Sequence, residues 1–196
     1  SSQPNIVRTA AVSSLGRSEV SVEERCASLI RVLPLKDQTI RAEAILQLAA
    51  LCERNPYENL SESSQVSLVN ELQTVAEDSS NYFSTRLEAV IGLAKLQHPL
   101  ALRLIEKMLK GGGLKGYQYP RLVDAVVAFG RPTKTGERTI LQSLQADDEF
   151  AQEAALKAIG KLRFPPDQLL PAVLQFVADN RFGSEKYALE ALAAFG

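Results

Sequence analysis

Small and hydrophobic residues recur along the chain in a six-residue pattern. It consists of Ala, a β-branched residue or Leu, two variable positions, a large apolar residue, and then Gly or Ala. The pattern occurs six times, at residues 11–16, 44–49, 89–94, 125–130, 155–160 and 191–196. In a helix of 3.6 residues per turn, its first, second, fifth and sixth positions share one face. Each copy therefore predicts a helix with an apolar stripe, and we call the leading Ala of each copy its motif alanine.

A second set of amphipathic segments lies between the copies, at residues 26–33, 66–76, 100–109, 140–144 and 169–178. Successive motif alanines are 33, 45, 36, 30 and 36 residues apart, which is room for two helices and their turns. The apolar positions do not alternate as a half-buried strand requires. The sequence therefore predicts an all-α protein of about eleven helices, with one unpaired helix at the N-terminus followed by five helical hairpins.

This pattern and its period resemble the HEAT repeat family, including the HEAT-like repeats of phycobilisome lyase-type proteins. In that family the second helix of a repeat commonly carries an arginine three residues before the motif alanine, as Arg8, Arg41 and Arg86 do here. The resemblance implies a right-handed α-solenoid, also called an α/α superhelix, whose second helices line the concave side. It covers residues 1–196 as a single HEAT-like repeat domain.

The later copies depart from the family pattern. Leu122, Gln152 and Ala188 occupy the arginine position in copies four to six. We therefore expect the buried Asp/Arg ladder of the family to be incomplete in the C-terminal half. The first copy has no preceding partner helix and nothing after Gly196 resembles a capping unit, so we expect the domain to be a fragment of a longer protein.

The amino-acid composition excludes several kinds of catalytic and metal site. The chain has 22 Lys and Arg, 23 Asp and Glu, one His and two Cys, which leaves too few ligands for a zinc site of the usual kind and little for triad catalysis. We expect no cofactor and no enzymatic activity. No apolar run approaches the roughly 18 residues of a membrane span, so a soluble protein is expected, with the cytoplasm favoured. Cys26 and Cys52 fall on facing apolar stripes; buried thiols are expected, and a disulfide stays open because it needs an oxidising compartment.

The net charge of the whole chain is close to zero, but the charges are distributed unevenly along the sequence. Residues 1–102 have a net charge of −3, residues 103–138 of +5 and residues 139–196 of −3. The basic central region is formed by Arg103, Lys107, Lys110, Lys115, Arg121, Arg131, Lys134 and Arg138. Either these residues form a solvated helical face, or they attract an acidic protein, a phosphopeptide or a nucleic-acid backbone.

The loop at residues 111–120 interrupts this basic region. Its glycines do not form a phosphate loop, because Gly116 is followed by Tyr117 rather than by Lys and Ser or Thr. Tyr117 and Tyr119 stand beside Lys115 and Arg121, so the loop is either a plain connection or a clamp for a peptide or a base.

Charged residues also recur at fixed positions relative to the motif alanine. The residue before the motif alanine is acidic in four copies, as at Glu88 and Asp124, and the sixth residue after it is basic in four, as at Arg131 and Lys161. These two positions are seven apart and share a helix face. Complementing the helix dipole accounts for them, and the functional alternative is a groove with acidic and basic stripes.

The leading hypothesis is a non-enzymatic scaffold or adaptor that binds another protein or peptide, acidic or phosphorylated, along its groove and central basic region. The residues expected to contact the partner are Lys115, Tyr117, Tyr119, Arg121, Arg131, Lys134, Arg138, Glu88 and Asp124. The alternatives are a domain that binds a nucleic-acid backbone and, less favoured, a lyase-type enzyme domain.

Overall fold

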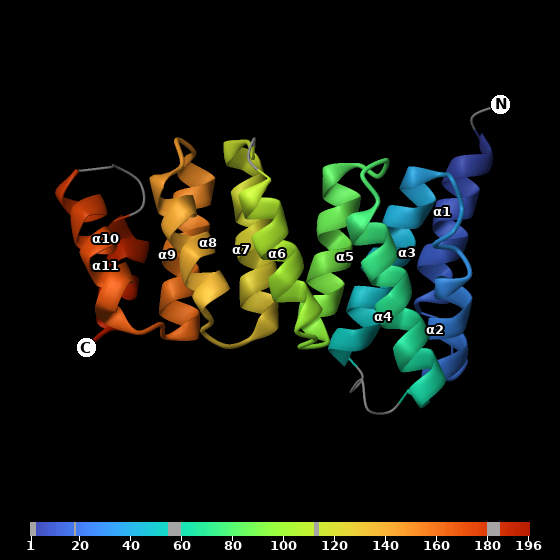
Figure 1. The fold of residues 1–196 in the computed structure, drawn as a ribbon. Coiled ribbons are helices and arrows are strands. Elements are labelled where there is room, and N and C mark those ends of the chain that lie inside the picture. Colours follow the sequence, from blue (N-terminus) through green and yellow to red (C-terminus); the bar gives the residue numbers. More distant parts are fainter. Residues whose placement is uncertain (1–2, 18, 55–59, 112–113, 180–184) are drawn as a thin grey trace. The chain divides into compact units, whose positions relative to one another are not determined.

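The computed structural model describes residues 3–17, 19–54, 60–111, 114–179 and 185–196. These residues form eleven α-helices and one short 3-10 helix, η2 (Gly116–Gln118), and contain no strand. The helices are α1 (Gln3–Leu15), α2 (Val22–Ile30), α3 (Gln38–Arg54), α4 (Glu62–Glu77), α5 (Phe83–Lys95), α6 (Leu100–Lys110), α7 (Tyr119–Phe129), α8 (Lys134–Gln145), α9 (Glu149–Leu162), α10 (Pro166–Ala178) and α11 (Glu185–Ala193) (Figure 1). The predictions of an all-α fold and of about eleven helices are confirmed.

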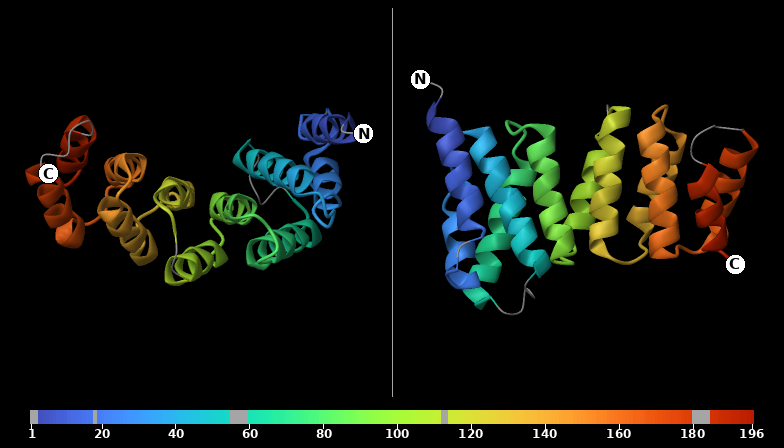
Figure 2. Two further views of the ribbon diagram at one scale, coloured as in Figure 1. Left: turned by 90° about the horizontal axis from the view of Figure 1, so that it is seen from above. Right: turned by 180° about the vertical axis from the view of Figure 1, so that it is seen from behind.

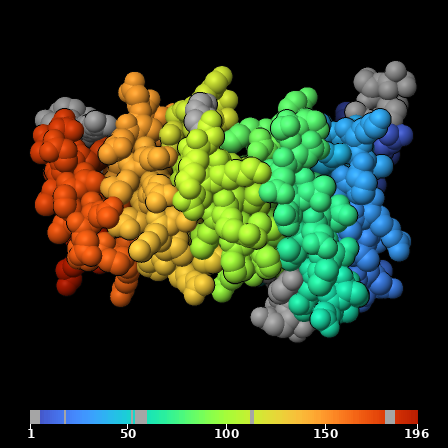
Figure 3. All heavy atoms as spheres, viewed as in Figure 1, coloured from blue at the N-terminus to red at the C-terminus, as the bar shows by residue number. Residues whose placement is uncertain are grey.

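The chain divides into two compact units, and each is built from two layers of helices. In unit 1 (Ser1–Ala101), α3 packs between α1 and α5, while α2 packs beside α4 in the other layer. In unit 2 (Leu102–Gly196), α9 packs between α7 and α11, while α8 packs beside α10. The two layers are seen end-on in Figure 2, and within each unit consecutive helices form adjacent bands of surface (Figure 3). The grouping of all 196 residues into a single domain stays a prediction.

The repeated pattern forms the core of each unit. Every copy lies in a helix of the first layer named above, and the motif alanines Ala44, Ala89, Ala125 and Ala155 are each 0% exposed. The absence of a longer side chain lets the neighbouring helices approach closely, and Gly92 continues this packing with its Cα against Leu72 of α4. Ala11 differs, because it is exposed on α1 although Val12 beside it is buried.

Side-chain caps set the helix starts. Ser61 accepts a hydrogen bond from the Ser64 amide at the start of α4, and Asp148 accepts one from Ala151 at the start of α9. Thr133 caps α8 through the Gly136 amide, so this helix starts six residues before the amphipathic segment at 140–144. The 45-residue interval between the second and third motif alanines includes residues 55–59, which lie outside the described residues.

The position three residues before the motif alanine has a shared structural role in two of the repeats of unit 1. Arg41 donates from Nε and Nη2 to the Leu35 carbonyl, at 3.2 and 2.7 Å, in the turn after α2. Arg86 donates from Nε to the Ala76 carbonyl, at 3.0 Å, in the last turn of α4. Arg86 thus satisfies a carbonyl in the last turn of the preceding helix, where intrahelical partners run out, whereas Arg41 satisfies a carbonyl in the turn that connects α2 to α3.

Unit 2 fills this position differently. Gln152 donates from Nε2 to the Ala146 carbonyl at 2.8 Å, just after α8, and is 7% exposed. Leu122 and Ala188 are buried at the equivalent positions of α7 and α11 and carry no donor. Arg8, the first arginine of the series, is exposed. The arginine series therefore acts at two positions, and a neutral amide replaces it at a third.

Candidate functional site

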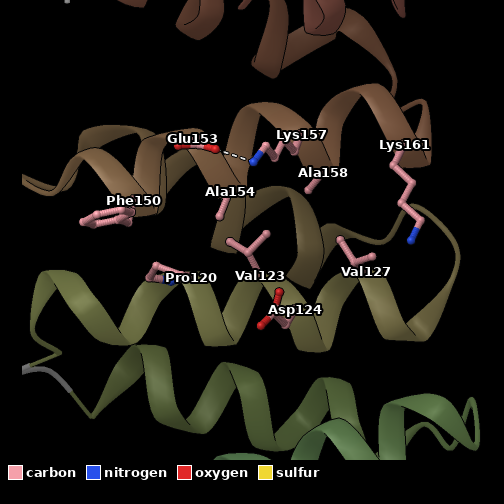
Figure 4. Close-up of a pocket in the computed structure, with 10 residues that line it drawn as sticks. All are labelled: Pro120, Val123, Asp124, Val127, Phe150, Glu153, Ala154, Lys157, Ala158 and Lys161. Carbon is pink, nitrogen blue, oxygen red and sulfur yellow. Dashed lines mark hydrogen bonds and ion pairs between the residues drawn. The ribbon is translucent and has the colours of Figure 1, made fainter. Parts of the chain in front are cut away.

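A groove of about 370 Å³ lies between α7 and α9 in unit 2 (Figure 4). The two helices run in the same direction, so their N-terminal ends meet at one end of the groove and their C-terminal ends at the other. The lining residues of α7 are Pro120, Val123, Asp124 and Val127, and those of α9 are Phe150, Glu153, Ala154, Lys157, Ala158 and Lys161. We call this feature the α7–α9 groove.

The groove has an apolar floor because of where its residues stand in the repeat. Val123 and Val127 lie two residues before and after the motif alanine of α7, and Ala154 and Ala158 lie one before and three after that of α9. Val123 and Ala158 are buried together with the motif alanines Ala125 and Ala155, whereas Val127 and Ala154 are partly exposed at the edge of the core. Two alanines on α9 opposite two valines on α7 leave the space that larger side chains would fill.

Ion pairs occupy most of the charged groups along the groove. Arg121 Nη1 lies 2.7 Å from Asp124 Oδ2, and Lys157 forms an ion pair with Glu153 on the same helix. Lys157 also lies over the Tyr187 ring of α11, 4.2 Å from its centroid. Its hydrogen bonds with Glu153 and Tyr187 raise the pKa of Lys157. These ion pairs border the apolar floor of the groove.

Lys161 is the exception among the charged residues of the groove. It lies in the last turn of α9, is exposed, and has no ion-pair partner among the residues that the structure describes. Its side chain extends from α9 toward the end of α7 near Val127 (Figure 4). A cation at a helix C-terminus is stabilised by the helix dipole, which still leaves its ammonium group available to an incoming carboxylate.

The opposite end of the groove is aromatic and apolar. Phe150 is 73% exposed in the first turn of α9, across from Pro120 in the first turn of α7. The 3-10 helix η2 packs against both α7 and α9, and a Cβ on Gly116 would lie 2.5 Å from the Cβ of Asp148. Tyr117 of η2 is 64% exposed. The loop at 111–120 is thus anchored at Gly116, while residues 112 and 113 lie outside the described residues.

The structure distributes the residues expected to contact a partner over several elements. Lys115 precedes η2, and Tyr119 and Arg121 lie in the first turn of α7. Of these expected residues, Asp124 alone is among those that line the α7–α9 groove. Glu88 belongs to α5 of unit 1 and is partly buried.

The remaining expected contact residues follow α7. Arg131 lies just beyond α7 with its guanidinium 5.3 Å from the centroid of the Phe129 ring. Lys134 and Arg138 lie on α8, in the other layer of unit 2, and are exposed. Arg138 Nη1 lies 2.7 Å from Glu106 Oε1 of α6, and Lys110 Nζ lies 3.2 Å from the same oxygen. Hydrogen bonds from Arg138 and Lys110 lower the pKa of Glu106, so part of the central positive charge is neutralised.

Several groove residues did not appear among the expected contacts. Phe150, Glu153, Lys157 and Ala154 were not selected, and Lys161 was noted only as part of the charge stripe. Their common feature is their position relative to the motif alanine Ala155: Phe150 lies five residues before it, Glu153 and Ala154 lie two and one before it, and Lys157 and Lys161 lie two and six after it. These positions lie beside the core stripe of the helix and face the neighbouring second helix.

The rare side chains have structural surroundings. Cys26 carries a free, buried thiol, and burial raises its pKa to about 11. The side chain of Cys52 lies outside the described residues. His98 accepts a hydrogen bond at Nδ1 from the Leu100 amide, at 3.4 Å, at the start of α6. Within the described part of the chain there is no cluster of three or more potential metal ligands and no helix long and apolar enough to cross a membrane.

Comparison with known proteins supports the fold. No family model matches the sequence, and no curated protein matches it. Among solved structures, the chain is similar to the crystal structure of an engineered protein from the Northeast Structural Genomics Consortium, with a TM-score of 0.53 and 15% sequence identity. The match covers 100% of this chain and 92% of the engineered one. At this identity the likeness shows a shared all-helical fold and says nothing of function.

Proposed function

We propose that the chain is a HEAT-like interaction scaffold, a right-handed α-solenoid that binds another protein or peptide without catalysing a reaction. The observation that carries this proposal is the α7–α9 groove. Its apolar floor is formed by Val123, Val127, Ala154 and Ala158, and its volume of about 370 Å³ falls in the range of ligand-binding clefts. An apolar cleft bordered by ordered charged groups gives a partner both buried area and orientation.

The repeat architecture supports the same proposal. In the described chain α2 packs against α3, α4 against α5, α8 against α9 and α10 against α11, and the second helix of each pair carries a copy of the pattern. Arg41 and Arg86 satisfy helix-end carbonyls from the position where the HEAT pattern has its arginine. Repeat proteins of this kind present large surfaces for their mass, and a partner can contact several repeats at once.

The paired charges favour a protein partner over a nucleic acid. Arg138 and Lys110 share Glu106, and Arg121 pairs with Asp124, so these cations are already partly neutralised. A nucleic-acid backbone is bound mainly through cations that release counterions, which gives strong salt dependence. A partner held by apolar contacts in the α7–α9 groove is less sensitive to salt.

The test uses one variant in the groove and one matched control. Ala154→Arg places a long cation on the groove floor, and Ala178→Arg places the same side chain at the exposed end of α10. Wild type and both variants serve as baits in extracts of the source cells, followed by mass spectrometry. The dissociation constant of each purified candidate partner is then measured by titration calorimetry.

We expect a protein that binds wild type and Ala178→Arg equally and binds Ala154→Arg at least about tenfold more weakly, a change of about 1.4 kcal/mol. Equal binding of that protein by both variants contradicts the proposal for this groove. Copurification of nucleic acid with steep salt dependence contradicts the choice of partner class.

A further inference from the structure

The α7–α9 groove also constrains the conformation of its occupant. Its ten lining residues include no Ser, Thr, Asn or Gln side chain, and three of its four charged side chains, Asp124, Glu153 and Lys157, already form ion pairs within the protein. The backbone groups of α7 and α9 are engaged in their own helices. An extended segment lying on Val127 and Ala154 would therefore lose water from its N–H and C=O groups without gaining partners there, which is costly. A helix has already satisfied these groups internally.

The dimensions of the groove also suit a helix. The groove face of α9 extends from Phe150 to Lys161, about 16 Å at a rise of about 1.5 Å per residue. A helical partner of about three turns covers this length. Its apolar side chains at a spacing of three and four residues would lie in the channel between the two valines of α7 and the two alanines of α9.

Charge determines the orientation of that helix. Asp124 and Glu153 have cationic partners within the protein, whereas Lys161 has none among the described residues. A carboxylate on the partner is therefore best placed at the Lys161 end. Acidic residues are most favourable in the first turn of a helix, so a partner that places its first turn at Lys161 runs antiparallel to α7 and α9. The opposite, aromatic end of the groove, at Phe150 and Pro120, then receives the partner's C-terminal apolar residues.

We propose that the α7–α9 groove binds an amphipathic α-helix of another protein, antiparallel to α9, with a carboxylate of its first turn paired with Lys161. Its apolar stripe packs on Val127 and Ala154 and ends against Phe150. This inference rests on the proposed function and specifies its partner.

The experiment selects a phage-displayed library of one helical scaffold, randomised on one face, against wild type and against Lys161→Glu. Lys186→Glu serves as the matched control, because Lys186 is an exposed lysine of α11 that does not line the groove. On wild type and on Lys186→Glu we expect Leu, Ile or Phe at a spacing of three and four, with Asp or Glu in the first turn. On Lys161→Glu we expect Lys or Arg at that first-turn position.

Selected sequences are then synthesised as stapled helices of about 14 residues, a length at which unstapled helices are marginal. Affinity is measured by fluorescence anisotropy. The acidic peptide is expected to bind Lys161→Glu about tenfold more weakly than wild type and Lys186→Glu the same as wild type. The same peptide with a central proline and no staple is expected to lose binding.

Three results overturn the inference: equal selection by wild type and Lys161→Glu, full binding of the proline peptide, or no enrichment of helical sequences that Ala154→Arg fails to bind. None of them removes the proposed function, which is judged by the Ala154→Arg and Ala178→Arg baits. A partner that is lost with Ala154→Arg but binds as an extended chain leaves the scaffold proposal standing and refutes the helix.

Discussion

In both units, a side chain three residues before a motif alanine donates a hydrogen bond to a backbone carbonyl that follows or ends the preceding helix, but the side chain differs between the units. In unit 1, Arg41 and Arg86 donate charged guanidinium hydrogen bonds to the carbonyls of Leu35 and Ala76. In unit 2, Gln152 makes one neutral amide bond to the Ala146 carbonyl. The comparison teaches that a donor at this repeat position can be charged or neutral, and Leu122 and Ala188 show that the fold also forms without one.

Arg41 has additional contacts that Gln152 lacks. Its Nη1 also donates to Asn81 Oδ1 and lies 3.9 Å from Asp78 Oδ2, and Asn81 in turn donates to the Val75 carbonyl at 3.0 Å. The arginine of unit 1 therefore joins the turn after α2 to the turn after α4. Gln152 joins only α8 to α9, so its removal affects fewer groups.

The largest effect is expected from Arg41→Ala. The substitution leaves the solvent-exposed Leu35 carbonyl and Asn81 Oδ1 without their donor, and we expect the free energy of unfolding to fall by about 1.5–3 kcal/mol. Urea denaturation measures the loss, and hydrogen exchange with mass spectrometry locates it in α2 to α5. Arg31→Ala, at an exposed arginine after α2, is the control. A loss no greater than that of the control would show that the Arg41 network is dispensable.

A smaller loss is expected from Gln152→Ala. The partly buried carbonyl of Ala146 loses its donor, which costs about 0.5–1.5 kcal/mol. The rate of amide hydrogen exchange should increase in α8 and α9 and stay unchanged in unit 1. The matched control is Gln145→Ala, an exposed glutamine at the end of α8. If Gln152→Ala destabilises the protein more than Arg41→Ala does, the ranking of the two units is wrong.

The smallest effect on stability is expected from lowering the pH, and we expect it to differ between the two units. Hydrogen bonds from Ser61 and Ser64 lower the pKa of Glu23, and hydrogen bonds from Ser80 lower the pKa of Asp78, both in unit 1. In unit 2, hydrogen bonds from Arg138 and Lys110 lower the pKa of Glu106. A folded pKa below the unfolded value contributes stability above the unfolded pKa, and this stability is lost as pH falls through the folded pKa.

The measurement is hydrogen exchange and thermal unfolding between about pH 6 and about pH 3, a range that spans the ordinary carboxyl pKa values. We expect protection to fall earlier in α4, whose start is capped through Glu23, than in α9. Glu23→Gln should reduce this pH dependence while Glu62→Gln, at an exposed neighbouring glutamate, should not. Equal acid sensitivity of Glu23→Gln and wild type would contradict the assignment.

Most of the fold could be predicted from the sequence because the repeat encodes it locally. A stripe such as Ala125, Val126 and Phe129 has to be buried, and each copy required a second helix to cover it. The start of α8 was harder to place, because residues 134–139 show little apolar pattern and the helix begins there through the Thr133 cap. The exposure of Ala11 depends on its packing surroundings, which the pattern alone does not specify.

The candidate site was less predictable because it depends on pairings between segments. Counting charges identified Arg138 as a contact residue, but the count does not reveal that Glu106, 32 residues earlier, lies against it. Tyr117 and Tyr119 stood out as aromatic residues in a loop, whereas Phe150 resembled an ordinary core residue. Its 73% exposure follows from the helix face on which it lies.

The separation of core and groove positions within each second helix has an evolutionary consequence. On α9, Ala155 and Ile159 hold the fold, while Ala154, Lys157 and Lys161 face the groove. Mutations at the second set change the shape and charge of the surface without altering the buried contacts of the first. The same framework can therefore acquire new binding preferences through single substitutions, and a designer could vary those positions while keeping the motif alanines fixed.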